Sequence, residues 1–229
     1  MEKPEPTPPP EVAADTEAEA DETREERTER RIELLSAAVM AFATILTAWS
    51  AYQSARWGGV SNIHELRVVG AIVKQGKFAN LAEQRRGLDV SLFGQWVSAT
   101  SMNETKLADF IFARFPEPLK TATIAWWATD PLNNPAAPSS PFAMAEYVLA
   151  ESAEELRWEN VATAESAAAE RAGDISDRYL LFTVIFAMTL FFAGISGKFG
   201  SFGINVAVLL LGGVVLAISA VIILALPVT

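Results

Sequence analysis

The chain lacks cysteine altogether and contains a single histidine, His64. Without cysteine it has no disulfide bond, no thiol nucleophile and no thiolate metal ligand. A zinc site built from histidine and cysteine is therefore excluded as well. The formal net charge is −10, and no basic stripe interrupts this acidity. Since phosphate neutralisation supplies most of the affinity for nucleic acid, we expect no nucleic-acid partner.

Motifs that carry catalytic chemistry are also missing. The pair His64-Glu65 begins like the zinc-protease motif H-E-x-x-H, but residue 68 is valine. The glycine-rich stretch "SGKFGSFG" (196–203) lacks a preceding strand and the spacing of a phosphate-binding loop, which favours a simple turn. We predict a non-enzymatic protein with no catalytic, cofactor-binding or metal-binding residues and no cofactor.

Three long apolar runs dominate what is present, at residues 34–53, 179–195 and 204–226. A helix of about 20 residues spans the hydrocarbon core of a bilayer, and no charged residue interrupts any of the runs. Three such runs exceed what one soluble core of this size accommodates. They predict transmembrane helices at 32–57, 179–196 and 204–226, with a short hairpin loop at 197–203.

Charge is concentrated outside these runs. Residues 1–31 are acidic and rich in proline and glutamate, which predicts a disordered tail. Arginines cluster just before the first run, and Lys198 lies in the hairpin loop. The positive-inside rule then places the N-terminus in the cytoplasm and residues 58–178 outside it.

The insert at 58–178 shows apolar residues at spacings of three and four, which indicates helices. Four glycines predict one or more breaks in its first arm: Gly70, Gly76, Gly87 and Gly94. We expect short helices at 103–115, capped by Asn103, and at 117–129, followed by a loop at 130–141. A long helix is predicted from Ala143 into the second span. The two arms would form an antiparallel stalk of the coiled-coil kind, capped by Trp126 and Trp127.

The predicted fold is thus an all-α membrane protein with three transmembrane helices. A helical, stalk-like extramembrane insert lies between the first and the second.

Two residue sets in the first span stand out. Trp49, Tyr52, Arg56 and Trp57 fit an aromatic and basic anchor at the membrane–water interface. Small residues every four positions form a helix-packing face: Ala43, Thr47, Ala51 and Ala55. Two alternatives stay open for this face, packing against the other spans of the same chain and self-association.

Four segments, "TAWSAYQSARWGG", "LADFIFARF", "ATDPLNNPAAPSSPFAMAEY" and "LLFTVIFAMTLFFAGI", carry a resemblance. Over residues 32–226 the chain resembles a group of uncharacterised bacterial integral membrane proteins. That group has one N-terminal span, a helical insert and a C-terminal two-helix transmembrane hairpin. The resemblance implies a multi-pass protein of the bacterial inner (plasma) membrane, and it carries no activity.

Two functions remain open. The first is a non-enzymatic interaction or scaffold protein, whose partners are the lipid bilayer, an unidentified protein and a second copy bound through the first span. The second is a subunit of a small oligomeric channel or transport component. A pore is lined by polar residues, and these are sparse in the spans, so we favour the first.

Overall fold

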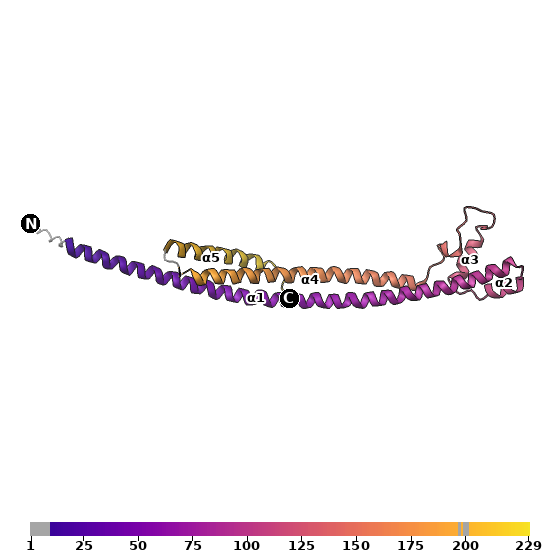
Figure 1. The fold of residues 1–229 in the computed structure, drawn as a ribbon, viewed down its shortest axis with the longest axis horizontal. Helices are drawn as coiled ribbons and strands as arrows, with labels where there is room; N and C mark the ends of the chain where they lie inside the picture. The colour runs from indigo at the N-terminus through magenta and orange to yellow at the C-terminus, as the bar shows by residue number, and fades with distance from the viewer. Residues whose placement is uncertain (1–9, 197, 199–201) are drawn as a thin grey trace, which may run out of the picture. The chain divides into compact units, whose positions relative to one another are not determined.

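The computed structural model describes residues 10–196, 198 and 202–229, although the side chains of residues 10–26 and 202 lie outside the description. The elements in chain order are α1 (Pro10–Ser101), α2 (Thr105–Phe112), α3 (Leu119–Trp127), the 3-10 turn η1 (Pro141–Ala143), α4 (Ala150–Ile195) and α5 (Phe202–Leu224) (Figure 1). The described residues contain no strand, which confirms the predicted all-α class. In the described part of the chain, three helices are long and apolar enough to cross a membrane, within Arg27–Ser101, Ala150–Ile195 and Gly203–Leu224.

The chain divides into two compact units. The first unit consists of Met1–Ser61 with Glu170–Thr229, and the second consists of Asn62–Ala169. Both α1 and α4 contribute to each unit, since each is one uninterrupted helix.

The predicted disordered tail at 1–31 is only partly within the described region. Residues 1–9 lie outside it, and the backbone is helical from Pro10. Arg27 to Arg31, the first residues with described side chains, are exposed. A helix without tertiary packing has only marginal stability in water. The disorder of this tail therefore stays a prediction.

In the first unit, α1, α4 and α5 pack around a small apolar core. Its buried members are Ala43, Tyr179, Phe182, Phe186, Leu216 and Ile223. Helix α5 runs antiparallel alongside α4 (Figure 1). A Cβ added at Gly212 would lie 3.7 Å from the Cβ of Phe192, and Tyr179 bonds the carbonyl of Pro227. Of the predicted hairpin loop at 197–203, residues 197 and 199–201 lie outside the described residues.

The first unit differs from a soluble protein in having an apolar outer surface. Its outer faces carry large exposed apolar side chains, among them Leu34, Phe42, Leu181, Phe191 and Val221. Beside the small apolar core, its helix contacts also bury polar residues, among them Ser36, Ser50, Gln53, Thr189, Ser196 and Ser219. Ser50 and Thr189 each donate to the carbonyl four residues earlier, Thr189 to that of Ile185 at 3.1 Å. Such bonds satisfy these buried hydroxyls within the helix itself.

In the second unit, the α1 segment from Asn62 lies antiparallel to the start of α4. His64 contacts Glu165, and the ammonium of Lys74 lies 3.9 Å from the centre of the Trp158 ring. The predicted glycine breaks are wrong, since α1 continues to Ser101. Each glycine costs a helix about 1 kcal/mol. A Cβ added at any of these four glycines would meet open space, so they lie away from the contact with α4. The packing of α1 against α4 offsets the cost of the glycines.

Two predicted boundaries in the second unit also need correction. Asn103 does not cap α2 with its side chain; its φ is 58°, a left-handed conformation that ends α1, and Glu104 holds the N-cap position. Helix α4 begins at Ala150 rather than at Ala143. Tyr147 and Leu149 are buried in the core of the second unit together with Phe115 and Leu119. Burial of these two side chains outweighs the helical propensity of the preceding segment.

Candidate functional site

The predicted packing face of α1 divides in the structure. Ala43 is fully buried and Thr47 half-buried, whereas Ala51 and Ala55 are exposed. A spacing of four advances by about 40° per step in a helix of 3.6 residues per turn, so the row rotates out of the contact. Ala51 and Ala55 therefore do not pack within the chain, and self-association through them stays a prediction.

Hydrogen bonds join α1 to α4 in the first unit. Ser36 donates a hydrogen bond of 2.7 Å to the carbonyl of Ala193. Ser176 donates one of 2.9 Å to the carbonyl of Ser54. Small hydroxyl residues at these positions allow close approach of the helices and also bond across the contact.

The four predicted interface anchors also differ in their surroundings. Trp49 and Tyr52 are exposed, with ring centres 6.2 Å apart, and Arg56 is exposed beside them. Trp57 is half-buried, and its indole N–H donates to the carbonyl of Pro227 at 3.0 Å. The anchor role stays a prediction for the set, while Trp57 has a second role in holding the segment that follows α5.

That segment, residues 225–229, is held by a polar cluster of the first unit. The Pro227 carbonyl accepts a second hydrogen bond from the Tyr179 hydroxyl at 3.2 Å. Gln53 is fully buried, and its Oε1 accepts from the backbone N–H and the hydroxyl of Thr229 at 3.3 and 3.1 Å. The Gln53 Nε2 is buried with no hydrogen-bond partner among the described residues. We call the three side chains that bond this segment, Gln53, Trp57 and Tyr179, the Gln53 cluster.

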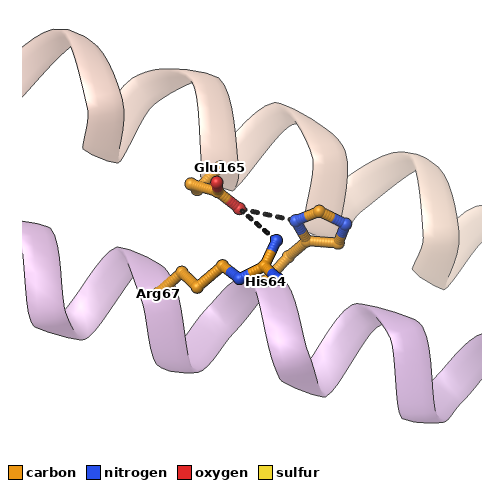
Figure 2. Close-up of polar contacts among 3 residues, drawn as sticks. All are labelled: His64, Arg67 and Glu165. Carbon is orange, nitrogen blue, oxygen red and sulfur yellow. Dashed lines mark hydrogen bonds and ion pairs between the residues drawn. The ribbon is translucent and has the colours of Figure 1, made fainter.

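His64 belongs to a polar contact in the second unit that joins α1 to α4 (Figure 2). Its Nδ1 lies 2.6 Å from Glu165 Oε2, and Arg67 lies 3.8 Å from the same oxygen. The His64 and Glu165 side chains are each about a quarter exposed. Figure 2 shows both α1 side chains converging on the carboxylate from one helix. His64, which the sequence excluded from a zinc-protease motif, thus lies in a contact between two helices.

Asp89 is the most deeply buried acid of the second unit, with a side chain only 1% exposed. The Tyr147 hydroxyl donates to its Oδ2 at 2.9 Å, and the Arg85 Nε lies 3.7 Å from its Oδ1. Burial raises the pKa of Tyr147 above its ordinary value, and the hydrogen bond and negative charge of Asp89 raise it further. Arg85 also donates to the Glu117 carbonyl at 2.7 Å. These contacts fasten the chain segments before α3 and α4 onto α1.

An aromatic cluster occupies the end of the second unit where α1, α2, α3 and η1 meet. Its members are Phe93, Trp96, Phe112, Phe115, Trp126, Trp127, Phe142 and Tyr147. Most contacts of Phe93 and Trp96 with the other elements are edge-to-face, a geometry that aromatic rings prefer. The Trp126 indole donates to the Pro138 carbonyl at 2.7 Å, which ties the proline-rich loop to α3.

A hollow of about 240 Å³ opens beside this cluster. It is lined by Trp96, Asp109, Phe112, Thr123, Ile124 and Trp127. Its walls come from three helices, and one carboxylate faces an otherwise mainly aromatic and aliphatic lining. We call it the aromatic hollow. The sequence placed Trp126 and Trp127 in a cap, but no local signal predicted that Trp96 and Asp109 would join Trp127 around one space.

Comparison with known protein families, curated proteins and solved structures gives no match for this chain. The candidate sites therefore rest on the residues and geometry of the chain itself.

Proposed function

We propose that this chain is a multi-pass protein of the bacterial inner membrane that acts as a non-enzymatic interaction protein and associates with a second copy of itself. In this proposal α1, α4 and α5 cross the bilayer. The N-terminus is cytoplasmic, and the second unit is an extracytoplasmic, stalk-like insert. The bacterial assignment rests on the resemblance of residues 32–226 to uncharacterised integral membrane proteins.

The apolar outer surface of the first unit supports the membrane setting. Exposure of so many leucine, phenylalanine and valine side chains is unfavourable in water. Lipid chains solvate these side chains well. Small and hydroxyl residues at the contacts are the residues that bring helices together in lipid. The arginines before the first span and Lys198 support the orientation.

The observation that carries the interaction role is an apolar stripe on α1 in the second unit. Ile63, Leu66, Val69 and Val73 are all more than half exposed. Spacings of three and four place them on one helix face, and His64 and Ala71, which pack toward α4, lie on the other. A contiguous apolar face outside the span is an interaction surface in water. Because a parallel second copy presents the same stripe, self-pairing covers both at once.

Disulfide crosslinking tests this pairing directly, since the chain has no native cysteine. Single cysteines at Leu66 and Val73 should form crosslinked dimers in native membranes. A cysteine at Ala164, exposed on α4 in the same unit, is the matched control and should not. Crosslinking at all three positions alike, or a monomeric mass for the detergent-extracted protein, contradicts self-association.

The channel alternative and the orientation have separate tests. Robust ion flux through purified protein in liposomes would favour the channel, whereas the interaction role predicts none. For orientation, an impermeant thiol reagent added to spheroplasts should label a cysteine at Asn134 and leave one at Ala13 unlabelled. Labelling at 13 without labelling at 134 would reverse the proposed topology.

A further inference from the structure

Three aromatic side chains line the aromatic hollow of the second unit. The ring centres of Trp96 and Trp127 lie 5.4 Å apart with an interplanar angle of 79°, so the two indoles meet nearly at right angles. The ring centre of Phe112 lies 6.0 Å from that of Trp96. Three rings from α1, α2 and α3 thereby border one space, and their positions are fixed by the packing of those helices.

The charge that lines the hollow is negative. Asp109 is the only charged residue among the described residues that line it. The described residues provide no ion-pair partner for its carboxylate, although Lys106 lies one turn earlier on α2. Thr123 adds a hydroxyl, but that group already donates to the Leu119 carbonyl at 2.7 Å. The hollow therefore brings a negative charge and three aromatic rings to one space.

We propose that the aromatic hollow binds a small organic cation whose charge is carried by a methylated or quaternary ammonium group. Such a group is attracted to the faces of tryptophan and phenylalanine, and its methyl groups fill apolar space that a hydrated metal ion does not. The Asp109 carboxylate adds a Coulombic attraction at the edge of the hollow.

The geometry favours this ligand over a neutral apolar one. Apolar pockets for neutral ligands usually bury most of the ligand surface, whereas Trp127 and Ile124 leave this hollow open to solvent, with Trp127 45% exposed. An open hollow still binds a cation, because the attraction to the ring faces and to a carboxylate does not require full enclosure.

Two probes that differ only in charge test the proposal with the full chain in detergent or nanodiscs. Choline carries a quaternary ammonium, and 3,3-dimethyl-1-butanol replaces that nitrogen with carbon and is neutral. Calorimetric titration should show saturable binding of choline to one site. The neutral isostere should bind roughly tenfold more weakly or not at all, because it loses the cation–aromatic and carboxylate attractions.

Variants then locate the site. Asp109→Asn and Trp127→Leu should each weaken choline binding roughly tenfold. Glu83→Gln, which removes another exposed carboxylate from α1 in the same unit, is the matched control and should leave binding unchanged. Far-ultraviolet circular dichroism checks that each variant remains folded.

Three outcomes overturn the proposal. If choline does not bind at millimolar concentration, the hollow is not a site for this class of cation. Equal binding of the two probes assigns it to neutral apolar molecules. Equal effects of Asp109→Asn and Glu83→Gln assign any choline binding to overall charge.

Discussion

The Tyr147 hydroxyl donates a 2.9 Å hydrogen bond to the buried carboxylate of Asp89, across 58 residues of chain. Tyr147 lies in the non-helical segment just before α4, and Asp89 lies on α1. The bond thus determines where the segment from η1 to α4 rests on α1 in the second unit. Its removal leaves a buried carboxylate oxygen without its donor.

Tyr147→Phe should therefore destabilise the second unit. The variant keeps the ring but removes the hydrogen-bond donor to Asp89 Oδ2. A buried acceptor without a donor lowers the free energy of unfolding by about 1–3 kcal/mol. Hydrogen exchange of amides in α3 and at the start of α4 measures the loss locally. Tyr52→Phe, which removes an exposed hydroxyl, is the control and should change nothing. Unchanged exchange in Tyr147→Phe would mean that the bond does not fasten this segment.

The same pair predicts a loss of stability at high pH. The pKa of Tyr147 is raised in the folded protein, so above about pH 10 the unfolded chain loses this proton before the folded chain does. The stability contributed by this tyrosine is fully present below about pH 10 and falls as the pH rises through the folded pKa. The difference in thermal midpoint between wild type and Tyr147→Phe should narrow above pH 10. A difference that stays constant or widens there would contradict the raised pKa.

The contact between His64 and Glu165 should make a modest contribution to the pairing of α1 with α4 in the second unit. The two side chains are a quarter exposed, so solvent screens part of their attraction. A double-mutant cycle with His64→Ala and Glu165→Ala at neutral pH should give a coupling free energy of about 1 kcal/mol. Arg67 lies farther from the carboxylate, so the Arg67–Glu165 cycle should give a smaller value. Equal couplings would mean that charge rather than the short hydrogen bond joins the helices.

The Gln53 cluster should hold residues 225–229 against the first unit. A spin label at Val228, which is exposed, should be immobilised in the wild-type background. Gln53→Ala and Trp57→Phe each remove hydrogen bonds to this segment and should increase label mobility. Trp49→Phe, which alters an exposed tryptophan of the same helix, is the matched control. Equal mobility in all four proteins would show that these bonds do not hold the segment.

Local sequence patterns sufficed for helix content but not for several helix ends. The break predicted at Gly70, Gly76, Gly87 and Gly94 did not occur, because these glycines lie on a face without close neighbours while the opposite face packs on α4. The start of α4 moved from Ala143 to Ala150 because Tyr147 and Leu149 are buried in the core of the second unit. In both cases a tertiary contact outweighed a local preference of about 1 kcal/mol.

The sequence by itself determined that the protein is all-helical, with three apolar helices of membrane-spanning length, because hydropathy and periodicity are properties of neighbouring residues. Only the tertiary structure decided which face of each helix is used. A row at spacing four turns out of the contact, and so Ala51 and Ala55 are exposed while Gln53 is buried. The register between helices likewise brought Thr229 to Gln53 and Trp127 to Trp96, contacts that depend on packing between segments distant in the chain.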